Sequence, residues 1–234
     1  MFSSLFDNVM KCIGLLTGPD TTEALRYLEE LHLEVRRRHG RGASAYVIAH
    51  HLDASRLGRL ESASQAKNAK ALILTTARNL KVAGAHLLVL GSSALHAIAS
   101  EMAAEADLPL CHVGHRTADT LASMRLQPAG LLATRSANEE AMWQRDLKVA
   151  GVTAIFPAAA DRAWIRNCLA EEMDPELCRA RWVRIATDLR HAGANVVVLC
   201  TPEASAYLRA EDLLLPLVCA AGQQVKAAVD AASE

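Results

Sequence analysis

Short apolar runs alternate along the whole sequence with longer segments in which apolar residues recur at helical spacing. This alternation is typical of βα units, in which each strand is followed by a helix and the strands form a mostly parallel sheet. The chain is therefore expected to be an α/β protein. We expect strands near residues 11–16, 45–49, 87–90, 110–113, 129–133, 153–156, 196–199 and 215–218.

The expected helices carry start and stop signals. Asp20 followed by Glu23 resembles a capping box at a helix start. Gly40 is a plausible stop for that helix, because glycine readily adopts the left-handed conformation that commonly ends helices. Three further glycines stand just before expected strands in the same way: Gly84, Gly151 and Gly193.

The sequence also contains an internal repeat. Residues 80–92 and residues 189–201 both run through Ala-Gly-Ala into an apolar strand, and residues 13–17 pair with residues 129–133 in the same order. Helix-glycine-strand units look alike in any α/β protein, but two pairs in the same order favour a duplicated lobe. We therefore expect two pseudo-symmetric Rossmann-like lobes. The first comprises residues 10–105 with 209–234, and the second comprises residues 106–208.

A duplicated fold directs attention to the ends of the equivalent strands. Ligands of open α/β sheets bind beyond the carboxyl ends of the strands, so two facing lobes would share one cleft. The repeated strands end at residues 91–93 and 200–201. The sequence predicts a site in that cleft, with the following strand-end residues lining it: Thr17, Gly18, Ser92, Ser93, Thr134, Cys200 and Thr201.

Cys200 has the most reactive side chain of this set. It follows a buried Val-Val-Val-Leu strand, where backbone amides and hydroxyls are expected to lower the pKa of a thiol from its usual value of about 8.5. A thiolate there would serve as a base toward a weakly acidic C–H bond, or as a nucleophile. The alternative is a small buried apolar residue, which describes most cysteines.

Composition narrows the range of functions. Lys and Arg (25) nearly balance Asp and Glu (26), and no basic run is interleaved with aromatic residues, so we expect no nucleic-acid partner. No apolar run reaches the length of a membrane span. The six cysteines form no C-x-x-C pair, which fits a cytoplasmic protein.

Residues 1–9 carry Asp7 and no basic residue, unlike a signal peptide, and Met10 is a plausible alternative start.

Residues near position 112 raise the question of a metal site. Cys111, His112 and His115 offer three ligands, and His50 with His51 offer two more. Adjacent ligands on a strand point to opposite faces, so the pattern suits one metal ion poorly and we expect none.

Motifs in five parts of the chain share the order and spacing of a known family: Met10-Lys11-Cys12-Ile13-Gly14-Leu15-Leu16, Val35-Arg36-Arg37-Arg38, Ala83-Gly84-Ala85 leading to Leu90 and His96, Gly130-Leu131-Leu132-Ala133-Thr134-Arg135, and the Cys200 strand. Together they resemble the cofactor-independent aspartate/glutamate racemases, over nearly the whole chain. Members of that family are two-lobed α/β proteins, commonly dimeric, that exchange the α-proton of an amino acid between two cysteines without pyridoxal phosphate or metal. The resemblance implies a homodimer without cofactor and a small carboxylate or amino-acid ligand.

The site departs from the family pattern more than the scaffold does. The family's first base lies in a stretch close to Cys-Thr-Asn-Thr-Met-His, and residues 91–96 here read Gly-Ser-Ser-Ala-Leu-His, so Gly91 replaces the first catalytic cysteine. The second catalytic cysteine matches Cys200. Other family ligand positions fall on residues of different chemistry: Tyr46, Ala137, Cys219, Ala220 and Gln224.

Four interpretations follow. In a one-cysteine racemase of an acidic amino acid such as aspartate or glutamate, Cys200 is the acid/base, and Ser92 or Ser93 supplies or positions the second proton. In a decarboxylase resembling arylmalonate decarboxylase, Gly91 occupies the first base position and Cys200 delivers a proton after carbon dioxide leaves. A maleate- or hydantoin-type reaction is the third interpretation, and a non-catalytic binding protein is the fourth. We take the racemase as the main one.

The main interpretation assigns each strand-end residue a role beside Cys200. The residues expected to bind substrate are Thr17, Gly18, Gly91, Ser92, Ser93, Thr134 and Thr201. Arg135, Arg162 and the helix amino-termini after Gly18 and Gly91 would supply positive charge for carboxylates. His96 either orients a loop or transfers protons.

Overall fold

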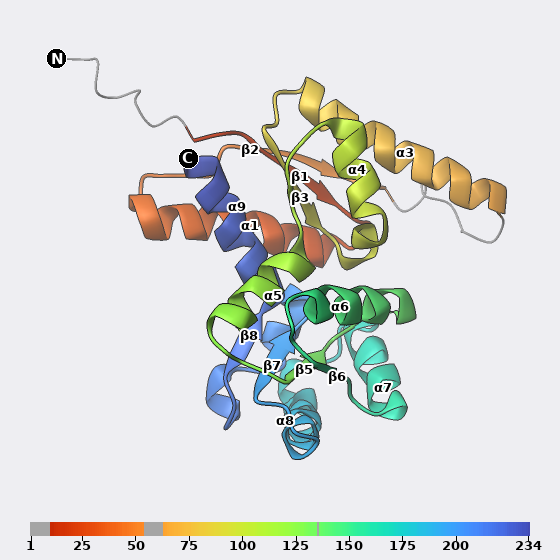
Figure 1. Ribbon diagram of the computed structural model, residues 1–234, viewed down its shortest axis with the longest axis vertical. Helices are drawn as coiled ribbons and strands as arrows, with labels where there is room; N and C mark the ends of the chain where they lie inside the picture. The colour runs from red at the N-terminus through yellow and green to blue at the C-terminus, as the bar shows by residue number, and fades with distance from the viewer. Residues whose placement is uncertain (1–9, 54–62, 135) are drawn as a thin grey trace. The chain divides into compact units, whose positions relative to one another are not determined.

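The computed structural model describes residues 10–53, 63–134 and 136–234. The chain forms two compact units, one from Met1–His112 with Gln224–Glu234 and the other from Val113–Gln223. Each unit contains one four-stranded parallel sheet with helices packed on it (Figure 1). The α/β class and the two parallel sheets predicted from the sequence are therefore confirmed.

The first unit is built on a sheet with strand order β2-β1-β3-β4. Its strands are β1 (Ile13–Thr17), β2 (Val47–His51), β3 (Leu87–Gly91) and β4 (Leu110–Cys111). The two central strands are buried along their whole length. This burial explains their continuous apolar sequences, because both faces of a parallel sheet are covered by helices.

The helices of the first unit are α1 (Thr21–His39), α3 (Ala63–Val82), the short 3₁₀ helix η2 (Ser93–Ile98), α4 (Ala99–Ala106) and most of α9 (Ala220–Ser233). Helix α1 buries Tyr27, Leu31 and Val35, which lie on one face at a spacing of four residues. The dark blue helix α9 lies beside α1 (Figure 1), where Arg38 forms an ion pair with Asp230.

The second unit repeats this plan with a sheet of order β6-β5-β7-β8. Its strands are β5 (Ala129–Leu132), β6 (Ala154–Ile155), β7 (Val196–Leu199) and β8 (Leu217–Cys219). Its helices are α5 (Val113–Ser123), α6 (Ala137–Val149), α7 (Ala159–Ala170), α8 (Pro175–His191), and the short 3₁₀ helices η3 (Pro202–Ala206) and η4 (Ala210–Asp212). The sequence repeats pair β1 with β5 and β3 with β7. The two strands of each pair hold the same place in their respective sheets.

Alternating residues of β7 belong to two different cores. Val196, Val198 and Cys200 lie in a cluster with Trp143 of α6. Val197 and Leu199 lie in a second cluster with Trp182 of α8, which stacks on Tyr207 with the ring centroids 5.2 Å apart. The two faces of the sheet are therefore packed separately, and Cys200 belongs to the face that α6 covers.

All eight predicted strands are present, and the predicted bounds of 196–199 match β7. The four predicted stop glycines all have positive φ: Gly40, Gly84, Gly151 and Gly193. Asp20 accepts a hydrogen bond from the backbone N–H of Glu23, as its position predicted. Val113 begins α5, however, and does not extend β4.

The division into units differs from the expected lobe boundaries. Strand β4 pairs with β3, so residues 106–112 belong to the first unit and not to the second. Strand β8 pairs with β7, so residues 209–223 belong to the second unit. Both differences have one cause. Each of these segments contains a short edge strand, and the pairing of such a strand cannot be predicted from the local sequence.

Among the described residues, no helix combines the length and apolar character needed to cross a bilayer. Residues 1–9, in which the sequence showed no signal-peptide pattern, and Arg135, an expected carboxylate ligand, lie outside the described residues.

Candidate functional site

Thr17 and Gly91 are neighbours at the carboxyl edge of the first sheet, where they are register partners of β1 and β3. Thr17 is buried, with 2% of its surface exposed. Its hydroxyl donates to the backbone oxygen of His50 at 3.4 Å and lies 3.0 Å from Nδ1 of His51. The structure therefore brings these two predicted residues together.

Gly18 and Ser92 follow β1 and β3 and approach each other closely. A Cβ atom added at Gly18 would lie 2.5 Å from Oγ of Ser92, which is too close for any larger residue without movement of the serine. Ser92 is buried, and Ser93 is the first residue of η2. The predicted cluster in the first unit is thus closely packed at its strand ends.

The position of Gly91 is filled by its neighbours. A Cβ atom there would lie 3.1 Å from side-chain atoms of Leu15, Thr17 and Tyr27. These contacts are shorter than those most side chains tolerate, so even an alanine requires the surrounding side chains to shift. The absence of a cysteine at this position is therefore accompanied by packing that occupies the space of its side chain.

Cys200 stands at the carboxyl edge of the second sheet, next to the end of β5. Its backbone N–H donates to the oxygen of Leu132 at 2.9 Å, and 4% of the residue is exposed. The side chain lies in the apolar cluster that includes Trp143 and Val198. Cys200 is thus a buried thiol at the edge where ligands of parallel sheets bind.

The pKa of the Cys200 thiol is raised well above its ordinary value, mainly because burial disfavours the thiolate and also because the carboxylates of Glu139 and Glu140 and the ionisable thiol of Cys219 lie nearby. The sequence-based expectation of a lowered pKa is wrong. A strand-end position lowers a thiol pKa only where donors or positive charge face the sulfur, and here apolar side chains and carboxylates surround it. Cys200 is therefore a protonated thiol at neutral pH.

Thr134 lies beyond the end of β5, in a cluster of charged side chains from α6 and α7. Its hydroxyl donates to Oε1 of Glu140 at 3.1 Å. The same oxygen lies 3.2 Å from Nε of Arg162 and 3.8 Å from Nη1 of Arg166. The residue before Thr134, Ala133, has a φ of 66°, a left-handed conformation that costs a non-glycine residue about 1–2 kcal/mol. The chain thus holds Thr134 in this cluster at the expense of backbone strain.

Thr201 follows Cys200 and is completely buried, with 0% exposed. Within the described part of the chain, no hydrogen-bond partner faces its hydroxyl. A buried hydroxyl without a partner costs about 1–3 kcal/mol. The hydroxyl of Thr201 is therefore a buried polar group whose hydrogen-bonding capacity is unused among the described residues.

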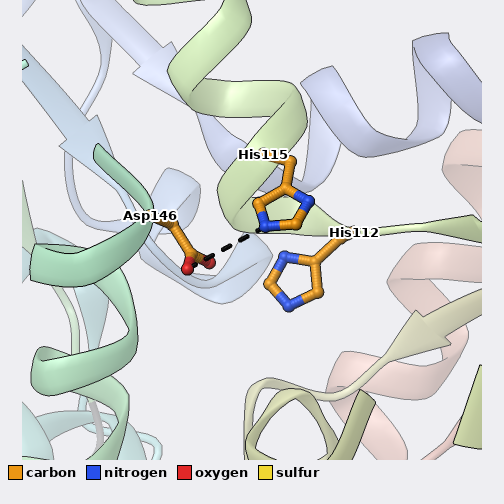
Figure 2. A group of neighbouring side chains, drawn as sticks. All are labelled: His112, His115 and Asp146. Carbon is orange, nitrogen blue, oxygen red and sulfur yellow. Dashed lines mark ion pairs between the residues drawn. The ribbon is translucent and has the colours of Figure 1, made fainter. Parts of the chain in front are cut away.

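His115 and Asp146 offer two metal-ligating groups in the second unit. Nε2 of His115 lies 4.0 Å from Oδ1 of Asp146, as the dashed line in Figure 2 shows. Asp146 also accepts a hydrogen bond of 2.9 Å from its neighbour Arg145. His112, labelled in the same figure, belongs to the first unit, where its ring packs edge-on against His96 with centroids 4.7 Å apart. That the chain binds no metal ion stays a prediction.

Three other residues singled out by the sequence lie in the first unit. Tyr46 is 55% exposed. Gln224 is fully buried in the first unit, where its side chain accepts from the hydroxyl of Tyr27 at 2.9 Å and donates to the backbone oxygen of Cys111 at 2.7 Å. The Nε2 atom of His96 lies 3.3 Å from the backbone oxygen of Leu90.

Sequence reasoning missed Glu139 and Glu140, the carboxylates whose charges act on Cys200. The sequence does contain a pattern that places Glu139 in the first turn of a helix. Ser136 and Glu139 have the spacing of a helix start, and the Ser136 hydroxyl accepts from the Glu139 backbone N–H at 3.2 Å. No local pattern indicates that the first turn of α6 faces the end of β7.

Comparison with known proteins identifies a family. The family model described as Asp/Glu/Hydantoin racemase matches residues 15–231. This match covers the strand ends of both sheets, including Gly91 and Cys200.

Solved structures with the same fold include a candidate Asp/Glu racemase from Yersinia pestis, with 24% sequence identity and a TM-score of 0.83, covering 96% of this chain and 100% of that chain. An aspartate racemase homologue from Pyrococcus horikoshii OT3 matches at 17% identity with a TM-score of 0.84 and the same coverage. Unliganded arylmalonate decarboxylase matches at 14% identity with a TM-score of 0.56, covering 95% of this chain and 92% of that chain.

Proposed function

The chain belongs to the Asp/Glu/hydantoin racemase family, and we propose that it transfers protons at the α-carbon of an acidic amino acid such as aspartate or glutamate, with Cys200 as its acid/base. The observation that carries this proposal is the place of Cys200, a buried thiol at the carboxyl edge of the second sheet. Thr201, with its buried hydroxyl, and Thr134 are the proposed carboxylate-binding residues beside it. Thr17, Gly18, Gly91, Ser92 and Ser93 stay proposed as substrate-binding residues of the first unit.

The proposed reaction uses one thiol twice. The Cys200 thiolate takes the α-proton, the electron pair of the C–H bond passes into the adjacent carboxylate as an enediolate, and the thiol returns a proton to the same carbon. Because Gly91 has no titratable side chain, a proton returning to the other face needs a weaker donor such as the hydroxyl of Ser92. Exchange with retention is therefore expected to be faster than inversion.

A second candidate function is decarboxylation, which the protonated state of Cys200 favours. In that reaction a C–C bond of a malonate-type substrate breaks, carbon dioxide leaves, and the electron pair stays on the α-carbon as an enediolate. The thiol of Cys200 then donates its proton, and the thiolate regains one from water. Only a donor is needed, so neither a second base at Gly91 nor a thiolate in the resting protein is required. The arylmalonate decarboxylase fold supports this candidate at the level of architecture alone.

The deciding experiment is proton–deuterium exchange at the α-carbon in D₂O, followed by NMR with chiral analysis, for L- and D-aspartate and glutamate. Cys200→Ala is the test variant. Cys178→Ala is the matched control, since Cys178 is equally buried in the same unit but lies in the other core. We expect exchange that Cys200→Ala abolishes and Cys178→Ala keeps.

The remaining outcomes of this experiment are informative. Exchange without inversion supports a single-thiol enzyme, and phenylmalonate would then be tried as a decarboxylation substrate. The absence of exchange with every amino acid, and of carbon dioxide release from phenylmalonate, would reject both proposed reactions in favour of a non-catalytic binding protein.

A further inference from the structure

Glu140 is held by its neighbours in the way that a carboxylate ligand would be held. Its Oε1 atom accepts a hydrogen bond from Thr134 at 3.1 Å and lies 3.2 Å from the guanidinium of Arg162. Arg166 adds a second positive charge at 3.8 Å. A hydroxyl donor and two guanidinium groups around one oxygen are the groups that proteins use to bind carboxylates.

All residues of this cluster belong to the second unit. Thr134 follows β5, Glu140 lies in the first turn of α6, and both arginines project from α7. The Arg162 guanidinium also donates to the backbone oxygen of Pro157 at 3.0 Å, which fixes its direction. The side chains of Glu140 and Arg162 are 17% and 30% exposed, so a dissolved anion can reach them.

Glu140 is also close enough to Cys200 for its charge to raise the pKa of the thiol. A carboxylate held by Thr134 and Arg162 therefore lies within electrostatic range of the proposed proton-transfer group.

We propose that Thr134, Arg162 and Arg166 form a binding site for the carboxylate of a small substrate, and that Glu140 occupies this site as a tethered competitor until substrate displaces it. The inference rests on the proposed function only for the identity of the ligand. The carboxylate of Glu140 and the carboxylate of a dissolved ligand compete for the same three side chains, those of Thr134, Arg162 and Arg166.

The size of the effect follows from the population of the open site. If Glu140 occupies the site for about 90–99% of the time, the apparent dissociation constant of an external carboxylate is raised about 10- to 100-fold. Neutralising Glu140 removes most of this competition, because an amide keeps the hydrogen bond to Thr134 but loses the attraction of the arginines. We therefore expect Glu140→Gln to bind small carboxylates at least about ten-fold more tightly.

The test is isothermal titration of the full chain with malonate and with L-aspartate, with uncharged malonamide as the blank. Glu176→Gln is the matched control, since Glu176 also lies in the first turn of a helix of the second unit and pairs with an arginine, Arg179, at 2.7 Å. The double variant Glu140→Gln with Arg162→Gln asks whether the gain requires the arginine. Glu140→Asp, which keeps the charge but shortens the side chain, gives an independent reading of the same competition.

The proposal predicts a gain in Glu140→Gln, a smaller gain in Glu140→Asp, none in Glu176→Gln, and loss of the gain in the double variant. Equal affinities in wild type and in both Glu140 variants would overturn it, as would a gain that survives Arg162→Gln. These are binding measurements, so they are independent of turnover. Tighter malonate binding without α-proton exchange would support the carboxylate site while rejecting the proposed racemase.

Discussion

Gly91 and Cys200 hold equivalent places in two sheets of the same strand order, each at the carboxyl end of the strand that lies third in its sheet. One position has no side chain and the other carries a thiol. The two ends also differ in packing, because the space beside Gly91 is occupied by Leu15, Thr17 and Tyr27. The two equivalent strand ends therefore differ both in chemistry and in packing.

Gly91→Cys is expected to destabilise the protein and to leave the α-proton exchange without inversion. The added Cβ atom meets Tyr27 and two other side chains at 3.1 Å, and such overpacking costs about 1–3 kcal/mol. Gly91→Ala is the matched variant, since it adds the Cβ atom alone. Urea denaturation measures both. If Gly91→Cys proves as stable as wild type and inverts substrate, the packing argument fails.

The rate of α-proton exchange is expected to rise with pH between pH 6 and pH 9, about ten-fold per pH unit. The pKa of Cys200 is raised, so the thiolate that takes the α-proton is scarce throughout this range and grows in proportion to hydroxide concentration. Glu139→Gln removes one of the charges that raise this pKa, and therefore shifts the profile to lower pH. A profile measured by NMR that is flat over this range would show that Cys200 is not the base.

Alkaline pH is expected to destabilise the second unit. Burial raises the pKa of Cys168 from 9.0 to about 11 and that of Tyr207 from 10.0 to about 12. A group whose pKa is raised by folding contributes stability below its unfolded pKa and loses it as pH rises through its folded pKa. Thermal unfolding should therefore show a falling Tm from pH 9 to about pH 12.

Tyr207→Phe tests this pH dependence. The variant loses the hydrogen bond of 2.9 Å to the backbone oxygen of Met173, which costs about 1 kcal/mol at pH 7. It should also lose part of the alkaline slope between pH 10 and pH 12, because one ionising group is gone. An unchanged slope would mean that the phenol of Tyr207 ionises equally in the folded and unfolded states.

Gln224→Leu is expected to cost about 2–4 kcal/mol, because it removes three buried hydrogen bonds of the first unit: one accepted from the hydroxyl of Tyr27 and two donated to the backbone oxygens of Cys111 and Leu90. Gln223→Leu is the control, since the neighbouring glutamine is less buried and accepts a single hydrogen bond from Thr120. Denaturant unfolding should separate the two variants by at least about 1 kcal/mol. Equal losses would show that the network around Gln224 adds nothing to stability.

The strands and helix ends were predictable because local chemistry determines them. Apolar runs such as that of β7 need cover on both faces, and Gly84 or Gly193 ends a helix through its own backbone conformation. The edge strands β4 and β8 have only two and three residues. Each is a strand because it pairs with β3 or β7, about 20 residues earlier in the chain, and no local sequence pattern indicates that pairing.

The positions of the site residues were predictable, but their electrostatics were not. The repeat placed Gly91 and Cys200 at strand ends, where the structure has them. The direction of the Cys200 pKa depends on burial and on carboxylates of α6, so it requires the tertiary structure. The homodimer implied by the resemblance stays a prediction, which light scattering would test.

The second unit is an uninterrupted stretch of chain, whereas the first needs Gln224–Glu234 to complete it. During synthesis on the ribosome, every strand of the second unit has therefore been made before Gln224 is added. Domains generally fold as units as the chain emerges. A chain that ended before Gln224 would therefore contain every residue of the second unit but would lack the helix residues that complete the first.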